Sequence, residues 1–140
     1  MWILYALGSA FFASLVAILG KVGLKDIDST LATTVRSVIM ATFLVLVALS
    51  FKKFNGVTLN SFGTREWVFV ALSGIAGAMS WLCYFYALKY GNTTTVSALD
   101  RLSVVFVAIL AATFLGESMN LYKIIGVVLV ALGAFMTILK

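Results

Sequence analysis

Long runs of uncharged residues, each long enough to cross a lipid bilayer, follow one another along the chain. The first run covers residues 1–20 and ends at Lys21. At about 1.5 Å per helical residue, such a run spans the ~30 Å hydrocarbon core of a membrane. Only 11% of the 140 residues are charged, whereas a soluble domain carries about 25%. The apolar side chains therefore need lipid around them, and the pattern predicts a membrane protein.

Charged residues and turn signals divide the chain into five helical segments. The expected helices cover residues 1–20, 30–51, 66–90, 96–116 and 121–139. The Asn-Gly and Phe-Gly steps within residues 52–65 mark turns, and Gly91-Asn92 marks a helix end. No run alternates with period two, so strands are not expected. We expect an all-α membrane protein whose five transmembrane helices form a single domain, residues 1–140.

Several function classes lack the residues that they need. The chain has no histidine and one cysteine, Cys83, and it carries no phosphate-binding glycine loop and no paired carboxylates. We therefore expect neither an enzyme nor a bound cofactor or metal. The net charge is +5, but the basic residues are scattered at helix ends, where they anchor among lipid headgroups. The expected partners are the bilayer and a small-molecule substrate, not nucleic acid.

Flanking charges give the chain little preference for one orientation. Lys52, Lys53, Arg65 and Lys123 lie on one expected side, and Lys21, Lys25, Lys89 and Lys140 lie on the other. Arg36 and Arg101 lie inside helices near the second side, which makes the balance six against four. In one interpretation, this weak bias fixes a single orientation. In the other, the chain inserts both ways and forms an antiparallel homodimer, equivalent to two fused inverted repeats.

Three charged residues lie within the expected helices and need an explanation. Asp100 fits a structural role, because Ser97-Ala98-Leu99-Asp100 matches a capping box. Its functional alternative is a group that binds a proton or a cation and couples transport. Arg36 and Arg101 either extend to the interface or meet Asp100 or an anionic substrate group.

The third expected helix ends in a polar and aromatic stretch. Ser80, Trp81 and Tyr84 share one face by their spacing and are candidates for the wall of a substrate cavity. The alternative is packing near the interfacial aromatic belt. On the fifth expected helix, Gly126 and Gly133 lie seven residues apart on one face, which is a smooth surface for a dimer contact. Packing within one subunit is the alternative.

Six stretches carry a resemblance to a known family. They are Ile18–Leu24, Leu31–Arg36, Tyr84–Gly91, Leu99–Phe106, Phe114–Glu117 and Gly126–Gly133. Together they resemble the EamA-type domain of the drug/metabolite transporter superfamily, in its half-length form. The resemblance covers essentially the whole chain. It implies one inverted-repeat unit of a ten-helix transporter fold, in which a cavity between two halves opens alternately to either side.

The resemblance also implies a cargo of small organic metabolites, amino-acid-like or drug-like, moved with proton coupling across a prokaryotic cytoplasmic membrane. Many full-length relatives have a proline near the start of the fourth helix, where this chain has Asp100-Arg101-Leu102-Ser103. Small multidrug resistance proteins have a similar plan, but they have four helices and an essential acid in the first. Here the first expected helix contains no acid.

The leading hypothesis is a secondary transporter that works as an antiparallel homodimer. In it, Asp100 couples transport, Arg36 and Arg101 balance charge or bind substrate, and Ser80, Trp81 and Tyr84 line the cavity. Two alternatives stay open. One is a membrane scaffold or partner subunit that transports nothing, and the other is a small-solute channel without counter-transport.

Overall fold

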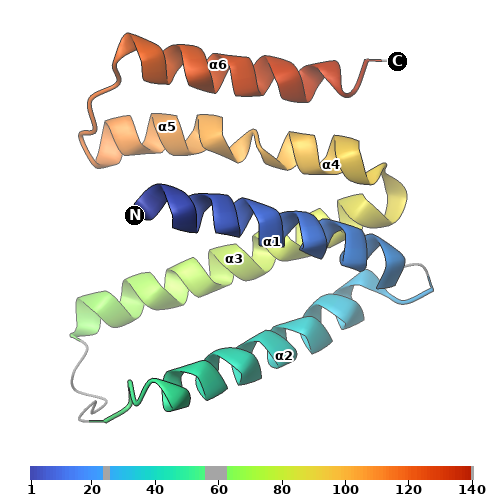
Figure 1. Ribbon diagram of the computed structural model, residues 1–140, viewed down its shortest axis with the longest axis vertical. Coiled ribbons are helices and arrows are strands. Elements are labelled where there is room, and N and C mark those ends of the chain that lie inside the picture. The colour runs from blue at the N-terminus through green and yellow to red at the C-terminus, as the bar shows by residue number, and fades with distance from the viewer. Residues whose placement is uncertain (24–25, 56–62, 140) are drawn as a thin grey trace. The chain divides into compact units, whose positions relative to one another are not determined.

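The computed structural model describes residues 1–23, 26–55 and 63–139. Lys25, Lys140 and the glycine of the Asn-Gly step lie outside the described residues, as does the phenylalanine of the Phe-Gly step. The secondary structure of the described ranges is helical (Figure 1). The helices are α1 (Trp2–Gly23), α2 (Ser29–Ser50), α3 (Thr64–Tyr90), α4 (Thr93–Asp100), α5 (Ser103–Phe114) and α6 (Leu121–Met136).

The segment expected as a fourth helix consists of α4 and α5, which are separated at Arg101-Leu102. The Arg101 and Leu102 N–H groups donate to Ala98 O and Leu99 O, three residues back. Both residues have ψ between −18° and −12°, which is typical of a 3₁₀ turn. The chain therefore tightens there without leaving the right-handed helical region, and Thr93–Phe114 still forms one 22-residue apolar span.

The chain divides into two compact units. Unit 1 contains Met1–Lys21 and Tyr90–Lys140, and unit 2 contains Val22–Lys89. The expectation of one single domain stays a prediction. In unit 1, α6 packs against both α4 and α5. Thr95 Oγ1 donates to Thr137 O at 3.2 Å.

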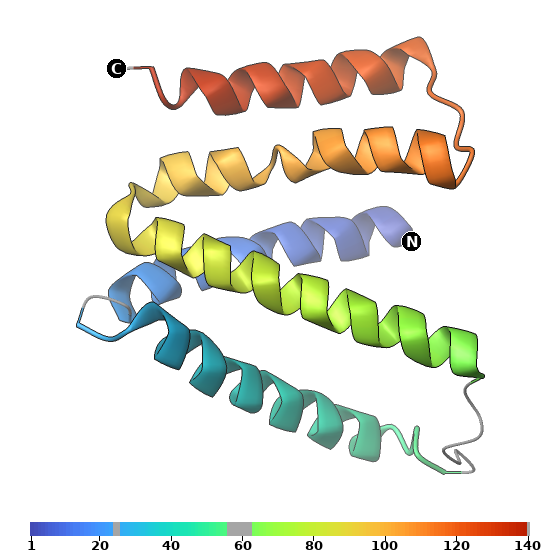
Figure 2. The same cartoon turned by 180° about the vertical axis from the view of Figure 1, so that it is seen from behind.

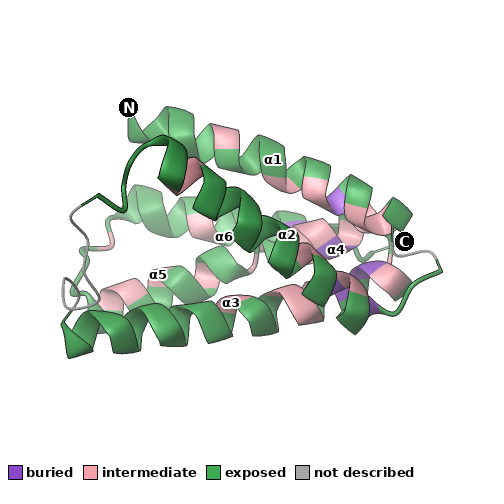
Figure 3. Cartoon of the chain, turned by 90° about the horizontal axis from the view of Figure 1, so that it is seen from below, coloured by how far each residue is buried: buried purple, intermediate pink, exposed green. Residues whose placement is uncertain are grey.

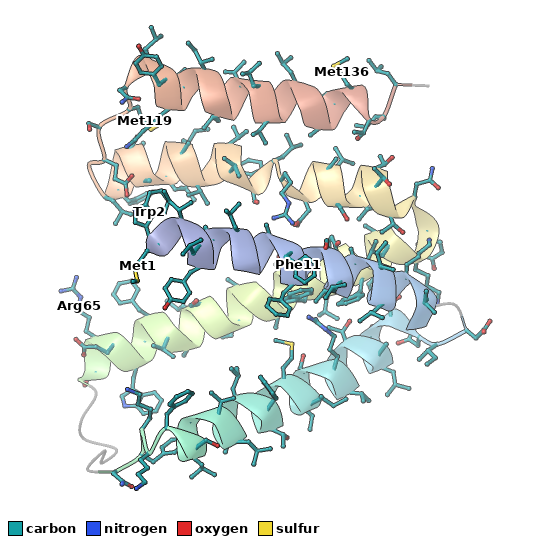
Figure 4. The ribbon with its side chains drawn as sticks, in the orientation of Figure 1. Met1, Trp2, Phe11, Arg65, Met119 and Met136 are labelled. Carbon is teal, nitrogen blue, oxygen red and sulfur yellow. The ribbon has the colours of Figure 1, made fainter. Side chains whose placement is uncertain are left out.

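Turns and caps fix the ends of the helices in unit 1. Gly116, with φ +64°, follows the end of α5 in the left-handed conformation that glycine adopts without strain. Asn120 caps α6 by accepting from the Lys123 N–H at 2.9 Å. Lys21 Nζ donates to Gly91 O at 2.8 Å and so ties α1 to the start of α4. The first residues of α1 and Met136 of α6 lie at opposite ends of the unit (Figure 4).

In unit 2, α2 and α3 run antiparallel and meet at one end. Lys89 Nζ donates to Ile27 O at 3.3 Å, and Thr30 and Tyr86 share a side-chain hydrogen bond of 3.1 Å. We call residues 27–36 and 81–89 the closed end of this pair. Away from it the helices diverge, as both opposite views show (Figures 1 and 2). Residues 43–50 and 64–75 form the open end.

Few side chains are buried among the residues that the structure describes. Among the described residues, the buried apolar side chains are Ala17, Phe85, Leu88, Val96 and Ala134. Exposed residues cover most of each helix except α4, whose residues are mostly of intermediate exposure (Figure 3). Four spans are long and apolar enough to cross a membrane, and α6 adds a shorter apolar helix of 16 residues. The predicted fold class, an all-α membrane protein with five membrane helices, is confirmed.

Most hydroxyl groups on α2 are hydrogen-bonded within the helix itself. Thr33, Thr34, Ser37, Thr42 and Ser50 each donate to the carbonyl oxygen four residues earlier, at 2.7–2.9 Å. Such bonds satisfy polar groups where lipid offers no partner. Two hydroxyls differ: that of Thr30 pairs with Tyr86 of α3, and the Oγ of Ser29 is fully buried and has no hydrogen-bond partner in the described chain.

Candidate functional site

Arg36 provides the only charge within α2, and its side chain lies against α3. Its Cζ atom is 3.8 Å from the centroid of the Trp81 ring and 5.0 Å from that of Phe85. Cation–π contacts of this kind contribute about 0.5–2 kcal/mol, with the larger values where water is excluded. The side chain is half-buried, so the guanidinium is held between two membrane helices.

Three aromatic rings of α3 form the surface on which Arg36 lies. Trp81 and Phe85 stack with centroids 5.6 Å apart and an interplanar angle of 24°. Tyr84 meets both rings edge-on, at 5.9 Å from Trp81 and 5.8 Å from Phe85. Residues three and four apart face the same side of a helix, which explains why these rings gather. We call Arg36, Trp81, Tyr84 and Phe85 the arginine–aromatic cluster.

The structure brings together three of the candidate residues predicted from sequence and adds one that was missed. Arg36, Trp81 and Tyr84 lie in the cluster, whereas Ser80 is exposed and takes no part in these ring contacts. Phe85 was overlooked, although it is only 3% exposed. The sequence spacing indicates Phe85, because it lies four residues after Trp81 and three before the buried Leu88. The helix face centred on Trp81 includes Phe85, whereas the face centred on Ser80 does not.

The guanidinium of Arg36 keeps its hydrogen-bond donors unused in the described chain. Its contacts there are the two ring contacts, and no carboxylate or carbonyl oxygen accepts from it. Stacking occupies a face of the planar group and leaves the N–H groups at its edges free to donate. A charged donor left unpaired at membrane depth is costly, so this position calls for an acceptor.

Asp100 and Arg101 lie in unit 1, at the break between α4 and α5, and both side chains are exposed. The predicted capping box is wrong. The helix begins at Thr93 with Asn92 as its N-cap, so Ser97 is inside α4 and Asp100 is its last residue. A carboxylate at the negative end of the helix dipole is not stabilised by it. Within the described ranges, neither the Asp100 nor the Arg101 side chain makes an ion pair or a hydrogen bond.

The two glycines of α6 face open space. A Cβ atom added to Gly126 or to Gly133 meets nothing within 4 Å among the described residues. They therefore take no part in a close helix contact within the described parts of this chain. The contact of a second chain with Gly126 and Gly133 stays a prediction.

A metal site is not apparent in the part of the chain that the structure describes. No group of three or more Cys, Asp or Glu side chains is placed there to hold an ion. Cys83 is exposed and free. The polar features that require an explanation are the arginine–aromatic cluster, the buried Oγ of Ser29, and the charged pair Asp100-Arg101 at the end of α4.

Comparison with known proteins gives the family. The EamA-like transporter family matches residues 1–139. A Sinorhizobium protein called "Uncharacterized transporter in cobO 3'region" is 41% identical over 135 residues, which cover 96% of this chain and 94% of that protein. An "Uncharacterized transporter" of Clostridium kluyveri is 26% identical over 96 residues, 69% of this chain and 30% of that protein. No solved structure matches.

The family match and the Sinorhizobium relative both extend over nearly the whole chain. They agree with the apolar helices, which fit a membrane carrier. This membrane protein is a transporter that belongs to the EamA-like transporter family.

Proposed function

We propose that the chain is a secondary transporter of small organic metabolites that works by proton-coupled alternating access as an antiparallel homodimer. The main supporting observation is the near absence of a buried core, since five apolar side chains are buried in the described residues. Lipid can cover apolar helices, but a polar solute needs a path lined by protein on all sides. A second copy supplies the missing walls.

The charged groups support the coupling part of the proposal. Asp100 is the last residue of α4, directly before the 3₁₀ turn that separates it from α5, and discontinuous helices hold substrates and ions in many transporters. The exposed side chain of Asp100 is accessible to a solute or an ion. We propose Asp100 as the coupling group and Arg101 as its charge balance.

Flux in proteoliposomes tests the transport proposal. The protein is reconstituted, a pH gradient is imposed, and labelled amino acids, organic acids and cationic dyes are screened for uptake. We expect saturable, gradient-driven uptake of one class, lost in Asp100→Asn but kept in Glu117→Gln, a control at an exposed carboxylate between α5 and α6. Flux that never saturates indicates a channel, and no flux of any solute contradicts the transporter. Uptake that is unchanged in Asp100→Asn removes the coupling role.

Labelling of introduced cysteines tests the antiparallel arrangement. In a Cys83→Ala background, Lys53→Cys and Asn92→Cys place single thiols beyond the ends of α2 and α3, on opposite expected sides of the membrane. If both orientations coexist, each thiol is labelled by a membrane-impermeant reagent in about half of the molecules. Complete labelling of one thiol and none of the other contradicts dual topology.

The open face of α6 is the proposed dimer contact. Gly133→Leu fills the space over that face, so we expect it to dissociate the dimer in detergent, whereas Gly8→Leu on α1 leaves it intact.

Both named relatives come from bacteria. We propose that the protein lies in the cytoplasmic membrane, which fractionation of expressing cells tests.

A further inference from the structure

We propose that the arginine–aromatic cluster is a binding site for the carboxylate of an organic monoanion whose apolar part lies against the rings. Arg36 binds the carboxylate, Trp81 and Phe85 hold the guanidinium, and the partly exposed Trp81 and Tyr84 contact the rest of the solute. This inference deepens the proposed transport function and rests on it for the role of the site. The binding itself is tested without transport.

Arg36 lies away from the ends of both helices that hold it. Arg36 is seven residues after Ser29, the start of α2, which is about 10 Å along the helix axis. Trp81 is nine residues before Tyr90, the end of α3, which is about 13 Å. The guanidinium is therefore roughly a third of the way into a ~30 Å hydrocarbon core. Its contact with the Trp81 ring keeps it from extending to the phosphates of the headgroups.

The unused N–H donors of Arg36 have a shape that suits a carboxylate. A guanidinium that stacks by its face presents parallel N–H groups at its edge, and these match the two oxygens of a carboxylate. The single positive charge balances one negative charge, so a monoanion leaves no net charge at this depth. A dianion leaves one negative charge uncompensated by the cluster.

The surroundings of the guanidinium are mainly aromatic. The hydroxyls in the same stretch of α2 have other partners, since Thr33 and Ser37 donate to carbonyls of their own helix and Thr30 pairs with Tyr86. The remaining neighbours in the cluster are aromatic rings. A site with one cation among aromatic rings selects a solute in which a carboxylate is joined to an apolar or aromatic group.

A fluorescence titration tests the site at equilibrium. The chain has three tryptophans, and replacing Trp2 and Trp67 with Phe leaves Trp81 as the only reporter. The full chain is placed in phosphatidylcholine nanodiscs and titrated with phenylacetate and with phenylacetamide, its neutral analogue. We expect a saturable change in Trp81 emission with phenylacetate, at an affinity about tenfold or more above that for the amide.

Three variants make the test specific. Arg36→Gln is expected to abolish the preference for the carboxylate over the amide. Arg36→Lys, which keeps the charge but lacks the planar fork, is expected to weaken it. Arg65→Gln is the matched control, because Arg65 also lies over a ring, 5.8 Å from the Phe69 centroid, but is exposed and points outward (Figure 4). Circular dichroism and gel filtration check that each variant is folded.

Several outcomes overturn the proposal. They are an unchanged preference in folded Arg36→Gln and the absence of saturable phenylacetate binding. The third outcome is that phosphatidylglycerol changes the Trp81 emission in an Arg36-dependent way and phenylacetate does not displace this lipid. The acceptor of Arg36 is then a lipid phosphate. Failure of the transport function is separate. Carboxylate preference without flux leaves this site standing, and saturable flux without the preference removes the site alone.

Discussion

The two ends of the α2–α3 pair have similar apolar content and different packing. At the closed end, Leu88 is fully buried, and side chains from both helices share a hydrogen bond and a cation–π contact. At the open end, Phe43 on α2 and Phe69 on α3 are both more than half exposed, and the aromatic contact of Arg65 is with its own helix. In lipid, apolar surface alone does not draw helices together, because lipid tails are as apolar as the side chains. The polar contacts therefore mark where the helices associate.

The largest effect is expected from the buried leucine of the closed end. Leu88→Ala leaves a cavity and should lower the free energy of unfolding by about 2–5 kcal/mol. Leu72→Ala, at the exposed open end, should stay within about 0.5 kcal/mol of the parent. Unfolding in mixed detergent micelles, followed by circular dichroism, measures both. Equal losses would show that the two ends are packed alike.

The second effect concerns the two arginine–aromatic contacts. A double-mutant cycle with Arg36→Gln and Trp81→Leu should give a coupling energy of about 1–2 kcal/mol, because the pair is half-buried and close. The cycle with Arg65→Gln and Phe69→Leu should give less than about 0.5 kcal/mol at the exposed end. The same unfolding assay supplies both cycles. A larger coupling at Arg65 reverses the comparison.

The third effect is that of the cap at the start of α2. The Asp28 carboxylate accepts from the N–H groups of Thr30 and Leu31 at 2.9 and 3.0 Å. Asp28→Ala should cost about 1 kcal/mol, while Asp28→Asn should retain most of the stability. Asp26→Ala, a neighbouring exposed carboxylate outside the cap, is the control. Thermal unfolding distinguishes them, and a loss in Asp26→Ala as large as in Asp28→Ala excludes the cap as the cause.

The smallest effect is expected from the hydrogen bond between Thr30 and Tyr86. Tyr86→Phe should reduce stability by about 0.6 kcal/mol, which is typical of bonds between membrane helices. Tyr90→Phe alters a tyrosine that is 79% exposed, so it should have no measurable effect. Hydrogen exchange at residues 29–33 provides a local readout, since a weaker contact lets that turn open more often. Unchanged exchange in Tyr86→Phe argues against a stabilising bond.

The uncharged runs predicted the helices because a chain segment in lipid needs apolar side chains and must pair its own backbone hydrogen-bonding groups. A helix meets the second requirement within one segment. The break at Arg101-Leu102 was not predictable in the same way, since the apolar run continues through it and hydropathy does not register a 3₁₀ turn. The capping box at Ser97 failed because helix start signals are short and often compete. Asn92 is also a favourable N-cap residue, and α4 begins directly after it, at Thr93.

The partners of Arg36 were also beyond prediction from the sequence. Spacing along α3 shows which rings share a face, but the register between α2 and α3 depends on the connection between them and on how the helices cross. Only the structure shows that Arg36 faces Trp81 and Phe85. For Gly126 and Gly133, the shared face was visible in the sequence and is open in the structure, and its dimer role stays a prediction.

The most direct test of the account is saturable uptake of labelled phenylacetate into proteoliposomes by three proteins measured side by side. These are the parent chain, Arg36→Gln from the closed end and Arg65→Gln from the open end. We predict that kcat/KM falls about tenfold or more in Arg36→Gln and stays within about twofold of the parent in Arg65→Gln. Uptake by folded Arg36→Gln at the parent's rate would contradict it.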